Sequence, residues 1–90
     1  MTEVRRTVRV TNRRGLHARA SAKFVTLASS QPTEVRVGKD GGEVTGTSIM
    51  GLMMLGAAMG DEIVIRAEGE RAEESVAALA RLVEDRFGED

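Results

Sequence analysis

The chain has 90 residues, of which 41% are hydrophobic and 30% charged, a balance typical of a folded globular domain. A chain of this length supports one core, and without cysteine that core has neither a disulfide nor a zinc–thiolate site. The longest apolar stretch, residues 49–60, is shorter than the roughly 20 residues that cross a bilayer, and the N-terminus has no secretory h-region. We therefore expect a single cytoplasmic domain over residues 1–90 that contacts no membrane.

The formal net charge of −1 hides an asymmetry along the chain. Residues 1–39 carry nine Lys or Arg and two Glu, whereas residues 40–90 carry four basic and twelve acidic residues. A basic half favours an anionic partner such as phosphate, an acidic protein surface or nucleic acid. A solvated strand face bearing arginines explains the charge equally well, so both interpretations stay open.

The apolar pattern of the first half changes its period once. Valines alternate along residues 3–10, which predicts a strand, and apolar residues then recur at helical spacing from Leu16. Pro32 ends this helix because the residue before a proline avoids helical geometry. Asp40-Gly41 is typical of a tight hairpin turn. The expected elements are a strand over residues 3–10, a helix over residues 18–29, and strands over residues 34–37 and 43–45.

In the second half, Thr47 and Ser48 are natural N-caps for a two-turn apolar helix that Gly56 ends. Alternating apolar residues then predict a fourth strand over residues 63–67. The order βαββαβα favours an α+β fold in which helices cover one face of a mostly antiparallel sheet. The last element is a long helix marked by Ala72, Val76, Leu79, Val83 and Phe87, with Gly88 beyond its end.

The inventory of reactive side chains excludes several chemistries. With one histidine and no cysteine, the chain has too few candidates for a catalytic triad, and no local carboxylates converge on His17 to hold a metal. Residues 46–51 have the glycine spacing of a P-loop, but Leu52 and Met53 replace the required Lys and Ser/Thr. We expect no cofactor and no metal.

His17 is the informative residue because it sits at the junction of an Arg-rich loop and the first helix. The unpaired N–H groups of Ala18 and Arg19 give the helix start a partial positive charge. This field disfavours imidazolium and so keeps His17 nucleophilic, and it welcomes a phosphate once attached. The Arg19 side chain can add a charge-assisted hydrogen bond to that group.

Residues 15–19 (GLHAR) and 48–53 (SIMGLM) together resemble the histidine-containing phosphocarrier (HPr) family of the bacterial phosphotransferase system, and the resemblance covers the whole chain. It implies an open-faced β-sandwich: a four-stranded antiparallel sheet with three helices on one face. It further implies that His17 takes a phosphoryl group on Nδ1 from phospho-enzyme I and passes it to an enzyme IIA. Arg19 would steady the phosphate, and Ser48 would match the serine modified by HPr kinase/phosphorylase in some bacteria. Such a chain is a relay, not an enzyme, and we expect a monomer.

Ala20 departs from the family pattern, which has proline there. Proline early in a helix fixes φ at no cost in hydrogen bonds, whereas alanine leaves an extra free N–H near the phosphate. We expect Ala20 to alter the lifetime of phospho-His17. Alanine here resembles the nitrogen-related regulatory branch of the family.

The methionine-rich segment is expected to be partly a docking surface, because a short helix that is apolar all round cannot bury every side on one sheet. Leu52 and Leu55 are assigned to the core. Ser48 is expected to be an N-cap, and phosphate there would weaken docking to acidic partners with little harm to the fold. The expected docking residues are Arg14, Ala20, Lys23, Phe24, Thr47, Met50 and Met53.

Two other functions fit the element order. RNA-recognition modules stack bases on sheet aromatics, but Phe24 and Phe87 are both placed on helices, so no nucleic-acid partner is expected. An acylphosphatase-like hydrolase would need Asn12 and Arg14 in its site, and no phosphate-binding loop surrounds them. A mainly regulatory member of the same family is the third alternative. The acidic end, Glu89 and Asp90, is expected to fray.

Overall fold

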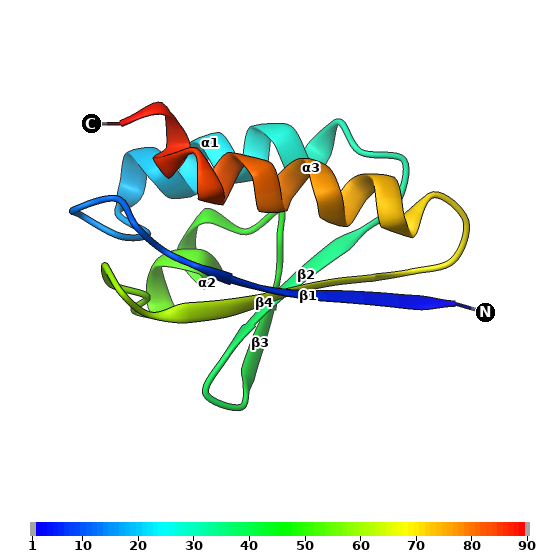
Figure 1. Cartoon of the computed structure of the whole chain (residues 1–90), viewed down its shortest axis with the longest axis horizontal. Helices are drawn as coiled ribbons and strands as arrows, with labels where there is room; N and C mark the ends of the chain where they lie inside the picture. Colours follow the sequence, from blue (N-terminus) through cyan, green and yellow to red (C-terminus); the bar gives the residue numbers. More distant parts are fainter. Residues whose placement is uncertain (1, 90) are drawn as a thin grey trace.

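The computed structural model describes residues 2–89 as a sheet covered on one face by helices (Figure 1). Helices α1 and α3 lie side by side along the sheet, and the shorter α2 lies at one end of this layer. The elements are β1 (Glu3–Arg9), α1 (Ala18–Ser29), β2 (Val35–Lys39), β3 (Gly42–Thr45), α2 (Ile49–Met54), β4 (Glu62–Glu68), α3 (Ala72–Glu84) and a 3₁₀ turn, η1 (Arg86–Gly88).

The sheet has the strand order β1-β4-β2-β3, and every neighbouring pair is antiparallel. Val8 pairs with Ile63, and Val37 pairs with Ile65, so that β4 presents its isoleucines to the helices from the middle of the sheet. The predicted βαββαβα order and the open four-stranded sheet with three helices on one face are confirmed.

The core lies between the sheet and the helix layer. Its largest fully buried side chains come from both layers, because alternate strand residues and one stripe of each helix point inward. They include Phe24, Phe87, Leu52, Ile63, Ile65 and Leu79. Leu52 is buried as predicted, and Leu55 packs against the edge of this core.

The β2–β3 turn is the hairpin that the sequence predicts. Asp40 and Gly41 both have positive φ (51° and 86°), as the central residues of a type I′ turn require. Helix α2 ends at Met54, and Gly56, just beyond its C-cap residue, also has a positive φ (67°). This confirms that Gly56 ends the helix, as predicted.

The end of the last helix differs from the prediction. Helix α3 ends at Glu84 rather than running through Phe87, because Arg86 and Phe87 take left-handed backbone conformations (φ 56° for each). Phe87 is nevertheless fully buried in the core. The chain therefore reverses through η1 to bury this ring, and the reversal carries the following residue toward the start of α1.

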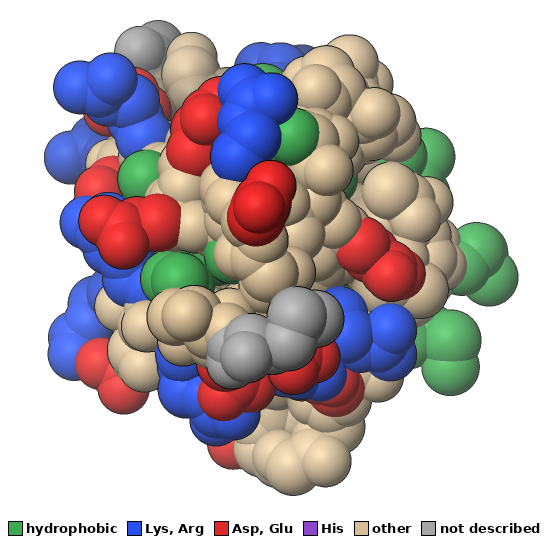
Figure 2. Space-filling view, turned by 90° about the vertical axis from the view of Figure 1, so that its right-hand side faces the viewer, with side chains coloured by type: hydrophobic (Ala, Val, Ile, Leu, Met, Phe, Trp, Pro, Cys, Tyr) green, Lys and Arg blue, Asp and Glu red, His purple; other side chains and the backbone are tan. Residues whose placement is uncertain are grey.

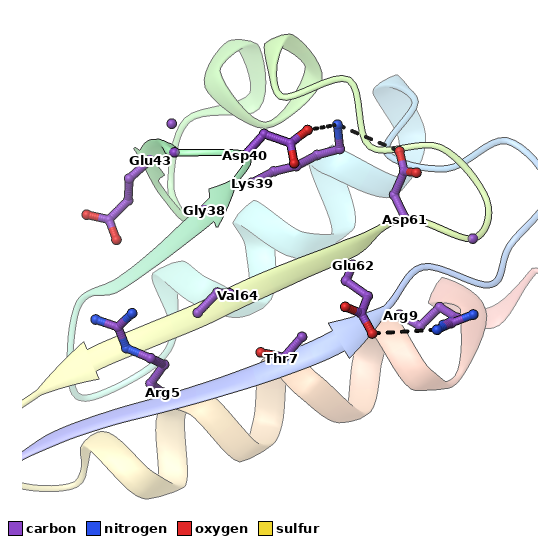
Figure 3. Close-up of a pocket in the computed structure, with 13 residues that line it drawn as sticks. Arg5, Thr7, Arg9, Gly38, Lys39, Asp40, Glu43, Asp61, Glu62 and Val64 are labelled. Atoms are coloured by element: carbon purple, nitrogen blue, oxygen red, sulfur yellow. Dashed lines mark hydrogen bonds and ion pairs between the residues drawn. The ribbon is translucent and has the colours of Figure 1, made fainter.

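The face of the sheet away from the helices is lined with charges of both signs. Figure 3 shows Lys39 between Asp40 and Asp61, and Arg9 against Glu62. Figure 2, which views the end that carries the N-terminus, likewise shows acidic and basic side chains intermixed. Within residues 2–89, no helix combines the length and apolar character needed to cross a bilayer.

Candidate functional site at the start of helix α1

His17, which the sequence places at the junction of the loop and the first helix, is the N-cap residue of α1. Its backbone is extended (φ −73°, ψ 177°) and its side chain does not cap the helix, so the ring is left for other contacts. The first helical hydrogen bond runs from Ser21 N–H to the His17 carbonyl at 2.9 Å. The backbone N–H groups of Ala18, Arg19 and Ala20 donate to no acceptor among residues 2–89. Three donors at a helix start form a cradle suited to an anion.

The loop before His17 is fixed by backbone contacts with the segment that follows α2. Leu16 N–H donates to the Ala57 carbonyl at 3.0 Å, and the Asn12 side chain donates to the Gly15 carbonyl at 2.8 Å. Gly15 has a positive φ of 60°, and a Cβ at this position would collide with the Ala57 carbonyl oxygen. Only glycine therefore allows this close approach, which sets where the helix begins.

The His17 ring is held by a carboxylate that the sequence did not indicate. Glu89 Oε2 lies 2.6 Å from His17 Nε2, and Glu89 Oε1 accepts from Asn12 Nδ2 at 3.1 Å. The predicted fraying is therefore wrong for Glu89, while Asp90 lies outside the described residues. Burial raises the pKa of Glu89, but the hydrogen bonds from His17 and Asn12 outweigh burial and the net effect is a lowered pKa.

Three arginines close to His17 in the sequence have no carboxylate within ion-pair distance among residues 2–89: Arg13, Arg14 and Arg19. All three are exposed, and Arg19 lies on the first turn of α1. Cations that the protein does not neutralise itself are available to an anion bound at the helix start.

Two of the predicted docking residues are wrong, because Ala20 and Phe24 are fully buried on the inner stripe of α1. Lys23 is exposed, and its ammonium donates to the Phe87 carbonyl at 2.7 Å. Arg14 and Thr47 are on the surface, where a partner can reach them.

The methionines of α2 and of the segment that follows it are exposed. Met50 is 69% and Met53 41% exposed, as expected of docking residues. The prediction missed Met54 and Met59, which are 79% and 58% exposed. We call Met50, Met53, Met54 and Met59 the methionine surface.

Ser48 is the N-cap of α2, as predicted. Its hydroxyl accepts from Gly51 N–H at 2.9 Å, and the residue is half-buried. This contact accounts for the capping role.

The alternative sites find no support in the geometry. Asn12 is fully buried and its amide contacts Gly15 and Glu89, so it does not form a pair with the exposed Arg14. Phe24 and Phe87 are in the core, so neither offers a stacking surface on the sheet. Among residues 2–89 no cluster of three metal-ligating side chains is present.

Comparisons with known proteins agree on one family. Residues 4–85 match the model described as the PTS HPr component phosphorylation site. The chain is 45% identical to the phosphocarrier protein HPr of Pseudomonas aeruginosa, over 91% of this chain and 92% of that protein. It is also 35% identical to the phosphocarrier protein NPr of Shewanella violacea, over 99% of this chain and 98% of that protein.

A solved structure agrees in fold. The crystal structure of HPr from Thermoanaerobacter tengcongensis has 43% sequence identity and a TM-score of 0.88, covering 100% of this chain and 99% of that chain. The fold and sequence therefore define a small phosphocarrier of the phosphotransferase system. The chain belongs to the HPr family.

Proposed function

We propose that this chain carries a phosphoryl group on Nδ1 of His17, accepting it from phospho-enzyme I and passing it to a histidine of an enzyme IIA. The observation that supports this most directly is the position of the imidazole beside three backbone N–H groups that have no acceptor among residues 2–89. An anion attached to His17 can take up those donors, and the helix dipole favours its charge. Catalysis of each transfer belongs mainly to the partners.

Arg19 is proposed to steady the bound phosphate, and Arg14 to contact the partner. Both are exposed cations close in sequence to His17, and neither has a carboxylate in ion-pair range within the described part of the chain. The methionine surface supplies an adaptable apolar area for the same partners, and the exposed Thr47 and Lys23 are proposed as further contacts. Arg19 and Lys23 also line a shallow hollow with Leu27 and Leu82.

The test is incubation with phosphoenolpyruvate and enzyme I, followed by mapping of an acid-labile modification by mass spectrometry. We expect one phosphoryl group on His17 and none on the His17→Ala variant. Circular dichroism of that variant should match the wild type, because the ring lies outside the hydrophobic core. Labelling of a different residue, or none in the wild type, would overturn the proposal.

A mainly regulatory role within the same family is the second candidate. It is supported by the resemblance to NPr and by Ala20, whose N–H has no acceptor within residues 2–89. The Ala20→Pro variant removes this donor and fixes φ. We expect phospho-His17 to decay at a different rate in this variant, and indistinguishable decay curves would contradict a role for Ala20 in its lifetime.

Ser48 is proposed as a site of regulatory phosphorylation by an HPr kinase/phosphorylase. A phosphate on Ser48 would lie at the start of α2, beside Met50 of the methionine surface. It would place negative charge where partners dock while suiting the helix start electrostatically.

We also propose that the chain acts as one cytoplasmic, monomeric carrier domain. The edge strand β1 carries Arg5, Arg6 and Arg9, and charged side chains at a sheet edge disfavour edge-to-edge pairing. Light scattering at micromolar concentration should give a mass near 9.7 kDa, and a mass twice that would contradict the monomer.

A further inference from the structure

The contact between Glu89 and His17 joins residues that lie 72 positions apart in the sequence. The two side chains are only 19% and 16% exposed, and Glu89 Oε2 lies 2.6 Å from His17 Nε2. The second carboxylate oxygen is not left in solvent, because Asn12 Nδ2 donates to it at 3.1 Å. Both carboxylate oxygens of Glu89 therefore have a hydrogen-bond partner, and together the two contacts fix the orientation of the carboxylate toward the imidazole ring.

The groups that hold Glu89 are themselves fixed. Asn12 is fully buried, and its amide nitrogen also donates to the Gly15 carbonyl, which orients it. Glu89 N–H donates to the Arg86 carbonyl at 2.9 Å. The Phe87 ring is buried, and the Lys23 ammonium donates a hydrogen bond to the Phe87 carbonyl. These two contacts keep η1 against α1. The carboxylate thus reaches His17 from a packed turn. Figure 1 shows the C-terminal segment that contains this turn lying along α1.

The charge of Glu89 decides which ring nitrogen of His17 carries a proton. Its lowered pKa keeps Glu89 ionised at neutral pH. An ionised carboxylate only accepts hydrogen bonds, so at 2.6 Å the His17 Nε2 has to donate and therefore bears the proton. In the neutral ring this leaves the lone pair of Nδ1 free. Carboxylates fix histidine tautomers in this way in metal sites and in catalytic triads.

We propose that Glu89 is a positioning residue that holds His17 in the tautomer protonated at Nε2 and thereby presents Nδ1 to the phosphoryl donor. This inference rests on the proposed function. In the transfer, the Nδ1 lone pair forms the N–P bond while the bond from phosphorus to the donor breaks, and its electron pair stays on the donor. Nε2 keeps its proton throughout. The positive charge that develops on the ring is faced by the Glu89 carboxylate, which stabilises the phosphorylated ring.

The test compares Glu89→Ala and Glu89→Gln with the control Asp85→Asn. Asp85 lies on the same turn and is exposed, and its side chain makes no contact with His17, so the control reproduces the charge change of Glu89→Gln alone. Long-range ¹H–¹⁵N spectra of the imidazole at pH 8 report the tautomer. Initial rates at varied carrier concentration, with phosphoenolpyruvate and enzyme I, separate kcat from KM.

We expect the wild type and Asp85→Asn to show the tautomer protonated at Nε2, and Glu89→Ala to show a mixture of both tautomers. We expect Glu89→Ala to lower kcat by about tenfold with little change in KM. Glu89→Gln should keep the tautomer, since its amide oxygen can accept from Nε2, and should lose less of the rate. An unchanged tautomer, an unchanged kcat or a faster transfer in Glu89→Ala would overturn this inference. If the wild type accepts no phosphate on His17, the proposed function itself fails.

Discussion

On the open face of the sheet, Arg66 contacts Glu3, Glu43 and Glu68, with distances of 2.6–3.4 Å. Around His17, by contrast, Arg14 and Arg19 have no carboxylate in ion-pair range among residues 2–89. The strand arginines of the basic half are paired in the same way as Arg66: Arg5, Arg6, Arg9 and Arg36 each have a carboxylate in ion-pair range. The basic half therefore divides into strand arginines that the protein neutralises itself and loop or helix arginines that it leaves available. The solvated strand face is confirmed for the strand arginines, and an anionic partner stays a prediction for the loop and helix arginines. The comparison teaches that a count of charged residues predicts a charged partner only when the residues already paired within the protein are left out of the count.

The largest effect should come from adding one methyl group at the helix start. Gly15→Ala puts a Cβ into the Ala57 carbonyl at a positive φ, and we expect it to lower the free energy of unfolding by about 3 kcal/mol. The matched control, Gly41→Ala, also has positive φ but meets no atom within 4 Å, so about 1 kcal/mol is expected there. Urea unfolding measures both changes. Phosphoryl acceptance should fall only in the first variant, and equal losses of stability would show that the Ala57 contact is unimportant.

The next effect separates the two groups of arginines. Arg19→Gln should slow phosphoryl acceptance by about tenfold, because it removes a cation from the bound phosphate. Arg9→Gln, on the open face and paired with Glu62 at 3.5 Å, changes the net charge equally and should leave the rate unchanged. Initial rates with enzyme I at low and physiological salt check this. Equal slowing by both would indicate a general effect of charge.

A smaller effect is expected at Ser48. Ser48→Asp adds negative charge beside the methionine surface while keeping an N-cap, so transfer from enzyme I should slow by about threefold at unchanged stability. Ser48→Ala loses the hydrogen bond from Gly51 N–H and should cost about 1 kcal/mol of stability without slowing transfer. Phosphorylation of Ser48→Asp as fast as wild type would contradict the regulatory role.

The smallest effect concerns the acid stability of the open face. The hydrogen bond from Arg66 lowers the pKa of Glu43 to about 2. Burial raises this pKa, and a second hydrogen bond, from Arg36, lowers it further. Because this folded-state pKa lies below the ordinary 4.5, the stabilisation is complete above pH 4.5 and is lost as the pH falls toward 2. In Glu43→Gln, the free energy of unfolding should change less between pH 4.5 and pH 2 than in the wild type. The exposed control Glu70→Gln should show the same pH dependence of unfolding as the wild type. Identical pH dependence in wild type and Glu43→Gln, measured by urea unfolding, would contradict the role of the Glu43–Arg66 pair.

Most of the fold was predictable because its signals are local. The alternation of valines and isoleucines, the Asp40-Gly41 turn and the Ser48 cap each depend on a few adjacent residues. The Phe87 turn was missed because the ring continues the helical spacing of α3, and only burial against other elements reveals the reversal. Phe24 and Ala20 were misplaced on the surface although their spacing already assigns them to the apolar stripe of α1.

The candidate site was predictable only in part. His17, Ala18 and Arg19 follow one another, so helix-start chemistry identifies them together. Glu89 lies 72 residues from His17 in the sequence, and Asn12 shows no polar pattern that distinguishes it from a loop residue. Contacts of this kind arise when packed elements bring distant segments together, and no local rule indicates them.

The bond from Leu16 N–H to the Ala57 carbonyl has a mechanical consequence. Ala57 lies in the segment between α2 and β4, which also carries the exposed Met59, and Leu16 immediately precedes His17, the proposed phosphate acceptor. A protein that contacts Met59 therefore touches a segment that is hydrogen-bonded to the residue before His17. For the docking and transfer proposed above, this bond means that the segment a partner contacts at Met59 also positions the residue next to His17.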